Sequence, residues 1–341
     1  GAGSKLVIHP QTLGVDVLDY SADGNGEASL VVAKGGERPD LKLDVELREG
    51  VMKRKDEAQA FIEKVEMSLQ ALVKEIKIDE KDLDIDLHLQ IPKAIVKDMS
   101  VYNQYLPPHS PMEFTGGKAK LSADIRMTPE TANGYVKLKT TDITARVDQQ
   151  DVAGELEVDI TLIDGAPEDM DFDISGSSLL LDNVRVVGTE ASHDDENWSA
   201  RFELNKARAL WKQPVDISLE ADLEMTDSQP IVAVIANQRG KHSWLEKALT
   251  IDDVSGEAAV NIVQDHIEIP YAFATSDKID IGAKGVITAD ERNGVFYVRF
   301  RKLHGILKIN DGKRNLDVLN AREKFDDFDS GMVLSGMSKS D

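Results

Sequence analysis

Strict alternation of apolar and polar residues dominates the chain. It is clearest over residues 83–91, 155–162 and 215–225, where aliphatic side chains alternate with polar and mostly acidic ones, and it recurs briefly over 41–47. Successive side chains of a β-strand point to opposite faces, so each segment has one apolar and one polar face. Parallel strands covered by helices would instead read as continuous apolar runs. The pattern predicts a mainly β, antiparallel architecture with one face open to water.

Glycine-containing turn signals separate these segments. Asn133-Gly134 follows the apolar run at 121–125, and Asn293-Gly294 follows the run at 281–287. Asn-Gly pairs favour the tight turns of β-hairpins. We therefore predict hairpins or short meander turns at both positions.

One segment has helical spacing instead. From about Arg54 to Ile76 apolar residues recur every three or four positions, and the opposite face carries charged and amide side chains. This spacing predicts one long amphipathic helix near residues 54–76, lying on the apolar face of the sheet. Its apolar positions are Ala58, Phe61, Ile62, Val65, Leu69, Leu72, Val73 and Ile76.

Two shorter helices are expected elsewhere. Ser243 is followed three residues later by Glu246, a capping box at the start of a helix over 243–248. Residues 98–105 form the second, which Pro107-Pro108 ends.

The charge balance limits the possible partners. Asp and Glu outnumber Lys and Arg by 62 to 40, which gives a formal charge of −22. A nucleic acid or an anionic membrane surface would be repelled unless basic residues were segregated into a patch. The longest basic run is Lys53-Arg54-Lys55, and the other basic residues are read as scattered among acids. We therefore expect no nucleic-acid partner.

The sequence contains no strong candidate for a catalytic or metal-binding site. The chain has no cysteine, and its seven histidines are isolated, so no thiolate zinc site, disulfide or His-x-x-x-His pair exists. His88 is interpreted as a solvated strand residue, and the acidic runs His193–Glu196 and 326–329 as solvated loops. Rows of similar exposed acids lack the contrast in environment that acid–base pairs need. We expect no enzyme activity, metal or cofactor.

The apolar strand faces are the largest shared feature. They are aliphatic, because aromatic residues make up only 5% of the chain. The faces form either the core of a closed sandwich or barrel, or an open groove that binds lipid. Each buried acyl methylene contributes roughly 0.8 kcal/mol, so apolar contact alone suffices to bind a lipid tail.

Three passages resemble the AsmA/TamB-like superfamily. Residues 102–107 followed by Phe114-Thr115-Gly116-Gly117 resemble its N-x-x-L-P … F-x-G-G-x-x-x-L passage. Residues 152–158 and 172–181 are similar to its G-x-L-x-x strand and S-G-S-x-L-x-L strand, and residues 254–258 and 279–285 resemble the same elements again. The resemblance covers roughly residues 95–315.

The resemblance implies an envelope protein without enzymatic activity. Such proteins form elongated, curved, taco-like β-grooves in the periplasm, are tethered to the inner membrane, and are implicated in phospholipid movement or outer-membrane homeostasis. It implies a phospholipid or other acyl-chain ligand. The opening Gly1-Ala2-Gly3-Ser4 is typical of a cloning remnant, so we expect the native anchor to precede Lys5.

The sequence also predicts the boundaries of the segments and the residues that line and gate the groove. We divide the chain into an N-terminal β segment (5–95), two β-groove repeats (96–192 and 193–325) and a flexible tail (326–341). We expect the helix to gate one end of the groove through Phe61, Val65 and Leu69. The expected groove residues are Leu156, Val158, Ile160, Leu162, Leu219, Leu223, Ile279 and Ile281.

Two alternatives remain at this point. The first is a closed sandwich or jelly roll that serves as a structural or interaction module of the envelope. The second is a carbohydrate-binding or carbohydrate-cleaving β-protein. It would need exposed aromatic platforms, whereas Trp198, Trp211 and Trp244 are scattered along the chain.

Overall fold

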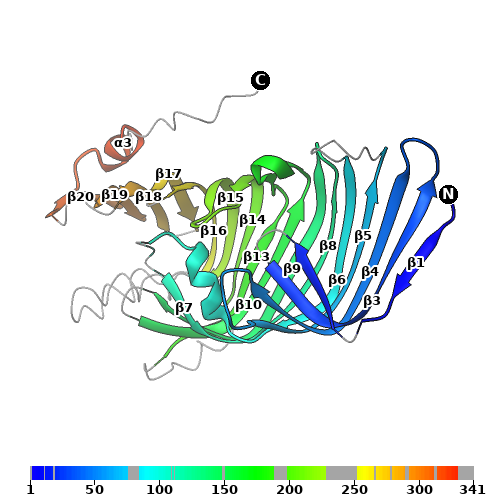
Figure 1. Ribbon diagram of the computed structural model, residues 1–341. Helices are drawn as coiled ribbons and strands as arrows, with labels where there is room; N and C mark the ends of the chain where they lie inside the picture. Colours follow the sequence, from blue (N-terminus) through cyan, green and yellow to red (C-terminus); the bar gives the residue numbers. More distant parts are fainter. Residues whose placement is uncertain are drawn as a thin grey trace.

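One large open antiparallel sheet forms the molecule (Figure 1). The computed structural model describes residues 2–10, 12–17, 20–75, 84–108, 110, 112–147, 150–187, 198–227, 252–264, 266–276, 279–288, 292–310 and 313–328. The predicted mainly β, antiparallel, curved architecture is confirmed. Among the described residues, no helix has the length and apolar character needed to cross a membrane.

The described strands are these. The first half comprises β1 (Lys5–Ile8), β2 (Leu13–Val17), β3 (Tyr20–Lys34), β4 (Asp40–Arg54), β5 (Ile62–Val73), β6 (Ile85–Val96), β7 (Met112–Gly116), β8 (Ala119–Met127), β9 (Ala132–Val147) and β10 (Gln150–Leu162). The second half comprises β11 (Asp164–Ala166), β12 (Asp171–Asp173), β13 (Ser178–Val186), β14 (Ala200–Leu210), β15 (Asp216–Asp227), β16 (Asp252–Val263), β17 (His266–Thr275), β18 (Ile279–Ile287), β19 (Arg292–Phe300), β20 (Leu303–Asn310) and β21 (Lys313–Asp317). The short helices are η1 (Met99–Tyr105), η2 (Pro167–Asp169) and α3 (Ala321–Asp326).

The strands follow each other across the sheet largely in chain order. The ladder runs from β3 through β6, β8–β10 and β13–β21, so the amino-terminal and carboxy-terminal strands lie at opposite edges (Figure 1). Strands β1 and β2 share the edge of β3, and β7 and β8 both pair with β9. This meander leaves a single layer with two faces.

Register shifts bend the long strands. They fall at neighbouring positions, between Asp23 and Asn25 on β3, Leu47 and Gly50 on β4, and Ile91 and Ala94 on β6. An extra residue on one strand kinks it and increases its twist. Gly50 has no room for a side chain, because a Cβ there would lie 2.2 Å from Leu47 Cδ2. The sheet is therefore curved into a trough (Figure 1).

The region predicted as a long amphipathic helix near residues 54–76 is instead strand β5, with β4 ending at Arg54. Val65, Met67 and Leu69 are all buried and alternate with Glu66 and Ser68, as in a strand. A bulge at Lys64, whose φ is 52°, adds the extra residue that places Ile62 and Val65 three positions apart. The bulge gives the apolar residues the three- and four-residue spacing that is typical of a helix. The helix prediction is wrong.

Other predicted elements have mixed outcomes. The helix expected over 98–105 is present as η1 (Met99–Tyr105), and the side chain of its N-cap, Asp98, accepts a hydrogen bond from Ser100 N. Both hairpins are present as β8–β9 and β18–β19, but each Asn-Gly pair lies inside the second strand of its hairpin. Gly134 is needed there because a Cβ would lie 2.0 Å from the Asp124 carbonyl oxygen.

The predicted division into segments stays a prediction. The boundary near residues 190–198 lies mostly outside the described residues, as do the helix over 243–248 and the tail beyond 328. Strands on the two sides of the boundary pair directly, with Leu179 opposite Phe202 in the β13–β14 ladder. The sheet is thus continuous between the two expected repeats.

Candidate functional site

The candidate site is the apolar inner face of the trough. Cross-strand partners place Val158 opposite Leu179, Leu179 opposite Phe202, and Phe202 opposite Leu223. The same row continues through Gly256, Ala274, Ile281, Val298 and Gly305. We call this set, from Val158 to Gly305, the apolar row. Sequence alternation predicts that each member faces inward, but only the register shows that they form one line.

All eight predicted groove residues lie on described strands, and they fall into three neighbouring clusters. Leu156 and Val158 belong to the amino-terminal core. Ile160, Leu162 and Leu219 pack with Ile174 and Val215. Leu223, Ile279 and Ile281 pack with Trp198. The predicted groove residues are therefore spread from β10 to β18 and have no single centre.

Burial separates lining residues from core residues. Leu156 and Ile279 are buried. Val158, Ile160, Leu162, Leu219, Leu223 and Ile281 are only partly buried. All described strands belong to one sheet, and its described helices are short, so no second sheet of the described residues covers this face. Partial exposure of aliphatic side chains leaves apolar surface accessible along the row.

The predicted gating residues have a different place. Phe61, Val65 and Leu69 are buried in the amino-terminal core, together with Leu47 and Val96. The Tyr20 ring meets Phe61 edge-on, with the centroids 6.1 Å apart. These residues form part of a buried core on and next to β5, and no helix is present there to gate a groove.

Helix η1 links distant parts of the sheet. The Tyr105 hydroxyl forms a hydrogen bond with the Tyr20 hydroxyl on β3, and the Tyr105 ring lies 5.0 Å from the Trp211 ring beside β14. Desolvation by burial is the first cause that raises the pKa of the Tyr20 hydroxyl, and it also raises that of Tyr102. Both phenols stay neutral. Sequence reasoning predicted this helix but not its bridging role.

Asn103 attaches η1 to the sheet. Its side-chain nitrogen donates to the Phe114 carbonyl oxygen at 2.8 Å, and its side-chain oxygen accepts from Phe114 N at 2.7 Å. The amide thereby replaces a strand partner for β7. The pairing joins the Asn and the Phe of the passage that resembles AsmA/TamB-like proteins.

On β9 and β10 the outer face is polar and carries cross-strand ion pairs. Lys137 Nζ lies 2.5 Å from Asp159 Oδ2, and Lys139 Nζ lies 2.6 Å from Glu157 Oε2. Each pair sits directly opposite in the β9–β10 register. Exposed pairs of this kind contribute little stability, about 0–1 kcal/mol each. Their main consequence is that the outer face of these two strands stays hydrated.

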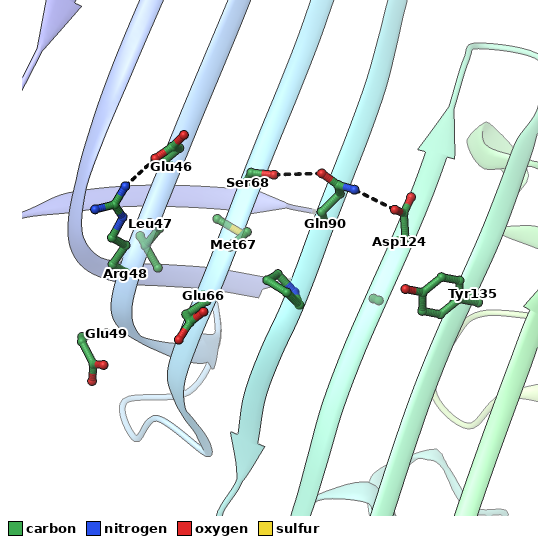
Figure 2. A pocket seen from close by; sticks show the side chains of 12 residues that line it. Glu46, Leu47, Arg48, Glu49, Glu66, Met67, Ser68, Gln90, Asp124 and Tyr135 are labelled. Atoms are coloured by element: carbon green, nitrogen blue, oxygen red, sulfur yellow. Dashed lines mark hydrogen bonds and ion pairs between the residues drawn. The ribbon is translucent and has the colours of Figure 1, made fainter.

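A polar pocket of about 560 Å³ lies over β4–β9 (Figure 2). Glu46, Ser68, Gln90, Asp124 and Tyr135 form a row across its wall, one residue from each strand. Gln90 Nε2 donates to Asp124 Oδ2 at 2.7 Å, as drawn in Figure 2. This bond, followed by the His88 contact to Asp124 Oδ1 at 2.8 Å, lowers the pKa of the Asp124 carboxyl. His88 is therefore partnered, whereas we expected it to be solvated.

The pocket and the other polar groups show no assembled metal site. Within the described ranges, no group of three or more His, Asp or Glu side chains is placed to hold an ion. The acidic run His193–Glu196 lies outside those ranges. Of the other acidic run, residues 326–328 are described, and they pack against β18, because Lys284 Nζ donates to the carbonyl oxygens of Asp326 and Phe328.

Sequence interpretation overlooked one basic segment. Residues 292–319 hold seven Lys and Arg against two Asp in a chain whose formal charge is −22. The residues are separated by apolar strand positions, so no long run is visible. A charge count in windows the length of a hairpin would have found the segment.

Comparisons of the chain with protein-family models, with curated proteins and with solved structures find no match. The resemblance to AsmA/TamB-like proteins therefore stays a prediction from the sequence.

Proposed function

We propose that this protein is a non-catalytic lipid-binding protein that holds acyl chains, those of phospholipid above all, in its inner groove. The apolar row is the observation that carries this proposal. The nine positions are aliphatic, aromatic or glycine, so their side chains offer no polar group to a ligand. Such a surface favours a ligand without hydrogen-bonding groups along its length.

The dimensions of the row support an acyl ligand. From Val158 on β10 to Val298 on β19 the row crosses neighbouring strands that are roughly 4.8 Å apart, a span of roughly 34 Å. One leaflet of a bilayer core is about 15 Å thick, so the row has the length of one or two chains. Gly256 and Ala274 lie between Leu223 and Ile281 and leave space above the sheet.

The groove is confined to the second half of the sheet. In the first half the inner face is packed shut by residues such as Val65, Val96 and Leu47, which have almost no exposed surface. This observation favours the alternative, a closed structural module, for β2–β9 only. We assign lipid binding to β10–β21.

The resemblance supplies the cellular setting of the proposal. It implies a protein of the periplasm that is tethered to the inner membrane. There it would bind or conduct phospholipid in support of outer-membrane lipid homeostasis. The lipid-binding part of the proposal rests on the groove and does not need this setting.

Native mass spectrometry after detergent-free purification tests the proposal. We expect a population of protein with added mass equal to one or two phospholipids or fatty acids, which dissociates at raised collision energy. A spectrum showing only the bare polypeptide, together with no uptake of added fatty acid, would contradict it.

A further inference from the structure

The groove ends in an exposed apolar lip on β19–β21. Leu303 is 76% exposed, Leu316 is 70% exposed and Phe296 is 37% exposed. Phe296 faces Leu307, and Leu307 faces Leu316, so these side chains share the inner face with the apolar row. A Cβ on Gly305 would lie within 4.0 Å of both Leu316 and Val318, which places them over the end of that row.

The opposite face of the same strands is sealed by α3. Phe325 is fully buried and sits over Gly282, where a Cβ would lie 2.5 Å from its ring. Tyr297 stacks near it at 5.6 Å, and Arg322 lies 4.8 Å above the Phe273 ring. The last strands are therefore packed against α3 on one face. The leucines on the other face are exposed to solvent. The exposure is not a consequence of loose packing.

Basic side chains flank the lip at both ends of the strands. Arg301 and Lys302 form the turn between β19 and β20, and Lys308 and Lys313 lie toward the turn between β20 and β21. All four are exposed. Lys308 lies on the α3 side of the sheet, because it pairs with the buried Val295, and Lys313 lies on the same side. The expectation that basic residues are scattered is wrong for this segment, where the sheet brings Arg301 and Lys302 next to Leu303.

We propose that this lip docks on the surface of an anionic phospholipid bilayer. The leucines would enter the interfacial region, and Arg301 and Lys302, next to Leu303, would lie among the lipid phosphates. A second copy of this chain is a poorer partner for the lip, because the two chains, each with a formal charge of −22, would repel each other. The proposal deepens the proposed function, since it names the site from which acyl chains would enter the groove.

The geometry explains why docking and binding belong together. Val298 and Gly305, the last members of the apolar row, lie between the lip residues Phe296 and Leu303. An acyl chain leaving the bilayer at the lip would meet a continuous apolar surface. It would not cross water before reaching Ile281.

Vesicle flotation tests the docking proposal. The wild-type 341-residue chain is expected to float with vesicles of phosphatidylglycerol and phosphatidylcholine and to stay behind with pure phosphatidylcholine. The double variants Leu303→Ser with Leu316→Ser, and Arg301→Glu with Lys302→Glu, should each lower binding about tenfold or more. Leu6→Ser with Ile8→Ser is the matched control, because both are at least 50% exposed on β1 at the other edge. This control should float like wild type.

Two further measurements separate the outcomes. Fatty-acid titration of the wild type and of Arg301→Glu with Lys302→Glu, which keeps every apolar side chain, should give the same affinity. Intact flotation of a wild type that binds no fatty acid would overturn the groove and not the lip. Light scattering should show no concentration-dependent self-association. Flotation unaffected by the lip variants, or a dimer that the leucine variant dissociates, would overturn the docking proposal.

Discussion

Replacing Leu223 with lysine is expected to weaken the binding of a fluorescent fatty acid by about 15- to 200-fold. Leu223 lies at the middle of the apolar row and is partly accessible. A lysine there would remove contact with two to four methylenes at roughly 0.8 kcal/mol each, about 1.6–3.2 kcal/mol in all. Titration of the protein into the labelled fatty acid measures the change.

Glu224→Lys is the control for this result. It places the same side chain one residue further along β15, on the exposed outer face. Its affinity should stay within about twofold of wild type, because the polar face makes no contact with the ligand. Equal loss in both variants would mean that charge, and not position in the groove, decides binding.

Replacing Val65 with aspartate is expected to lower the free energy of unfolding by about 4 kcal/mol or more. Val65 has no exposed surface and lies at the bend of β5, opposite Gly50. An unpaired carboxylate in that position would lose its hydration without gaining a partner. Urea denaturation followed by circular dichroism measures the loss.

Lys64→Asp is the matched variant, since it puts the same residue at the adjacent, exposed bulge position. Aspartate tolerates the left-handed backbone at that position better than most residues do. We expect a change of less than about 1 kcal/mol. If Val65→Asp lowered the free energy of unfolding as little as Lys64→Asp, Val65 would not lie in the buried core of residues 62–73.

Period-two alternation was a reliable guide to the sheet. Over 155–162 and 215–225 it identified β10 and β15 and the inward-facing side of each, because a strand fixes that side at every residue. The prediction at 54–76 failed for a local reason. Phe61, Val65 and Leu69 are spaced by four, which suits either a helix or a strand, and the bulge at Lys64 removed the alternation that would have separated them.

The sequence predicts which side of each strand contributes to the candidate site, but not that these side chains form one cross-strand row. Alternation assigns Val158, Leu223 and Ile281 to the inner side of three strands. It contains no information on which residues become cross-strand neighbours, since register depends on turns and bulges distributed along the whole chain. The bridging contact of Tyr105 with Tyr20 and Trp211 is long-range for the same reason.

Quenching of Trp198 by a brominated acyl chain would show directly whether acyl chains bind on the inner face. Trp198 is buried in the inner-face cluster with Leu223 and Ile281, so a ligand in the groove would bring bromine close to this indole. The measurement uses Trp211→Phe with Trp244→Phe, which leaves Trp198 as the single fluorophore. We expect saturable quenching by brominated stearic acid, and Leu223→Lys should shift this quenching to roughly 15- to 200-fold higher fatty-acid concentration. Saturable binding of the same fatty acid without any quenching of Trp198 would contradict it.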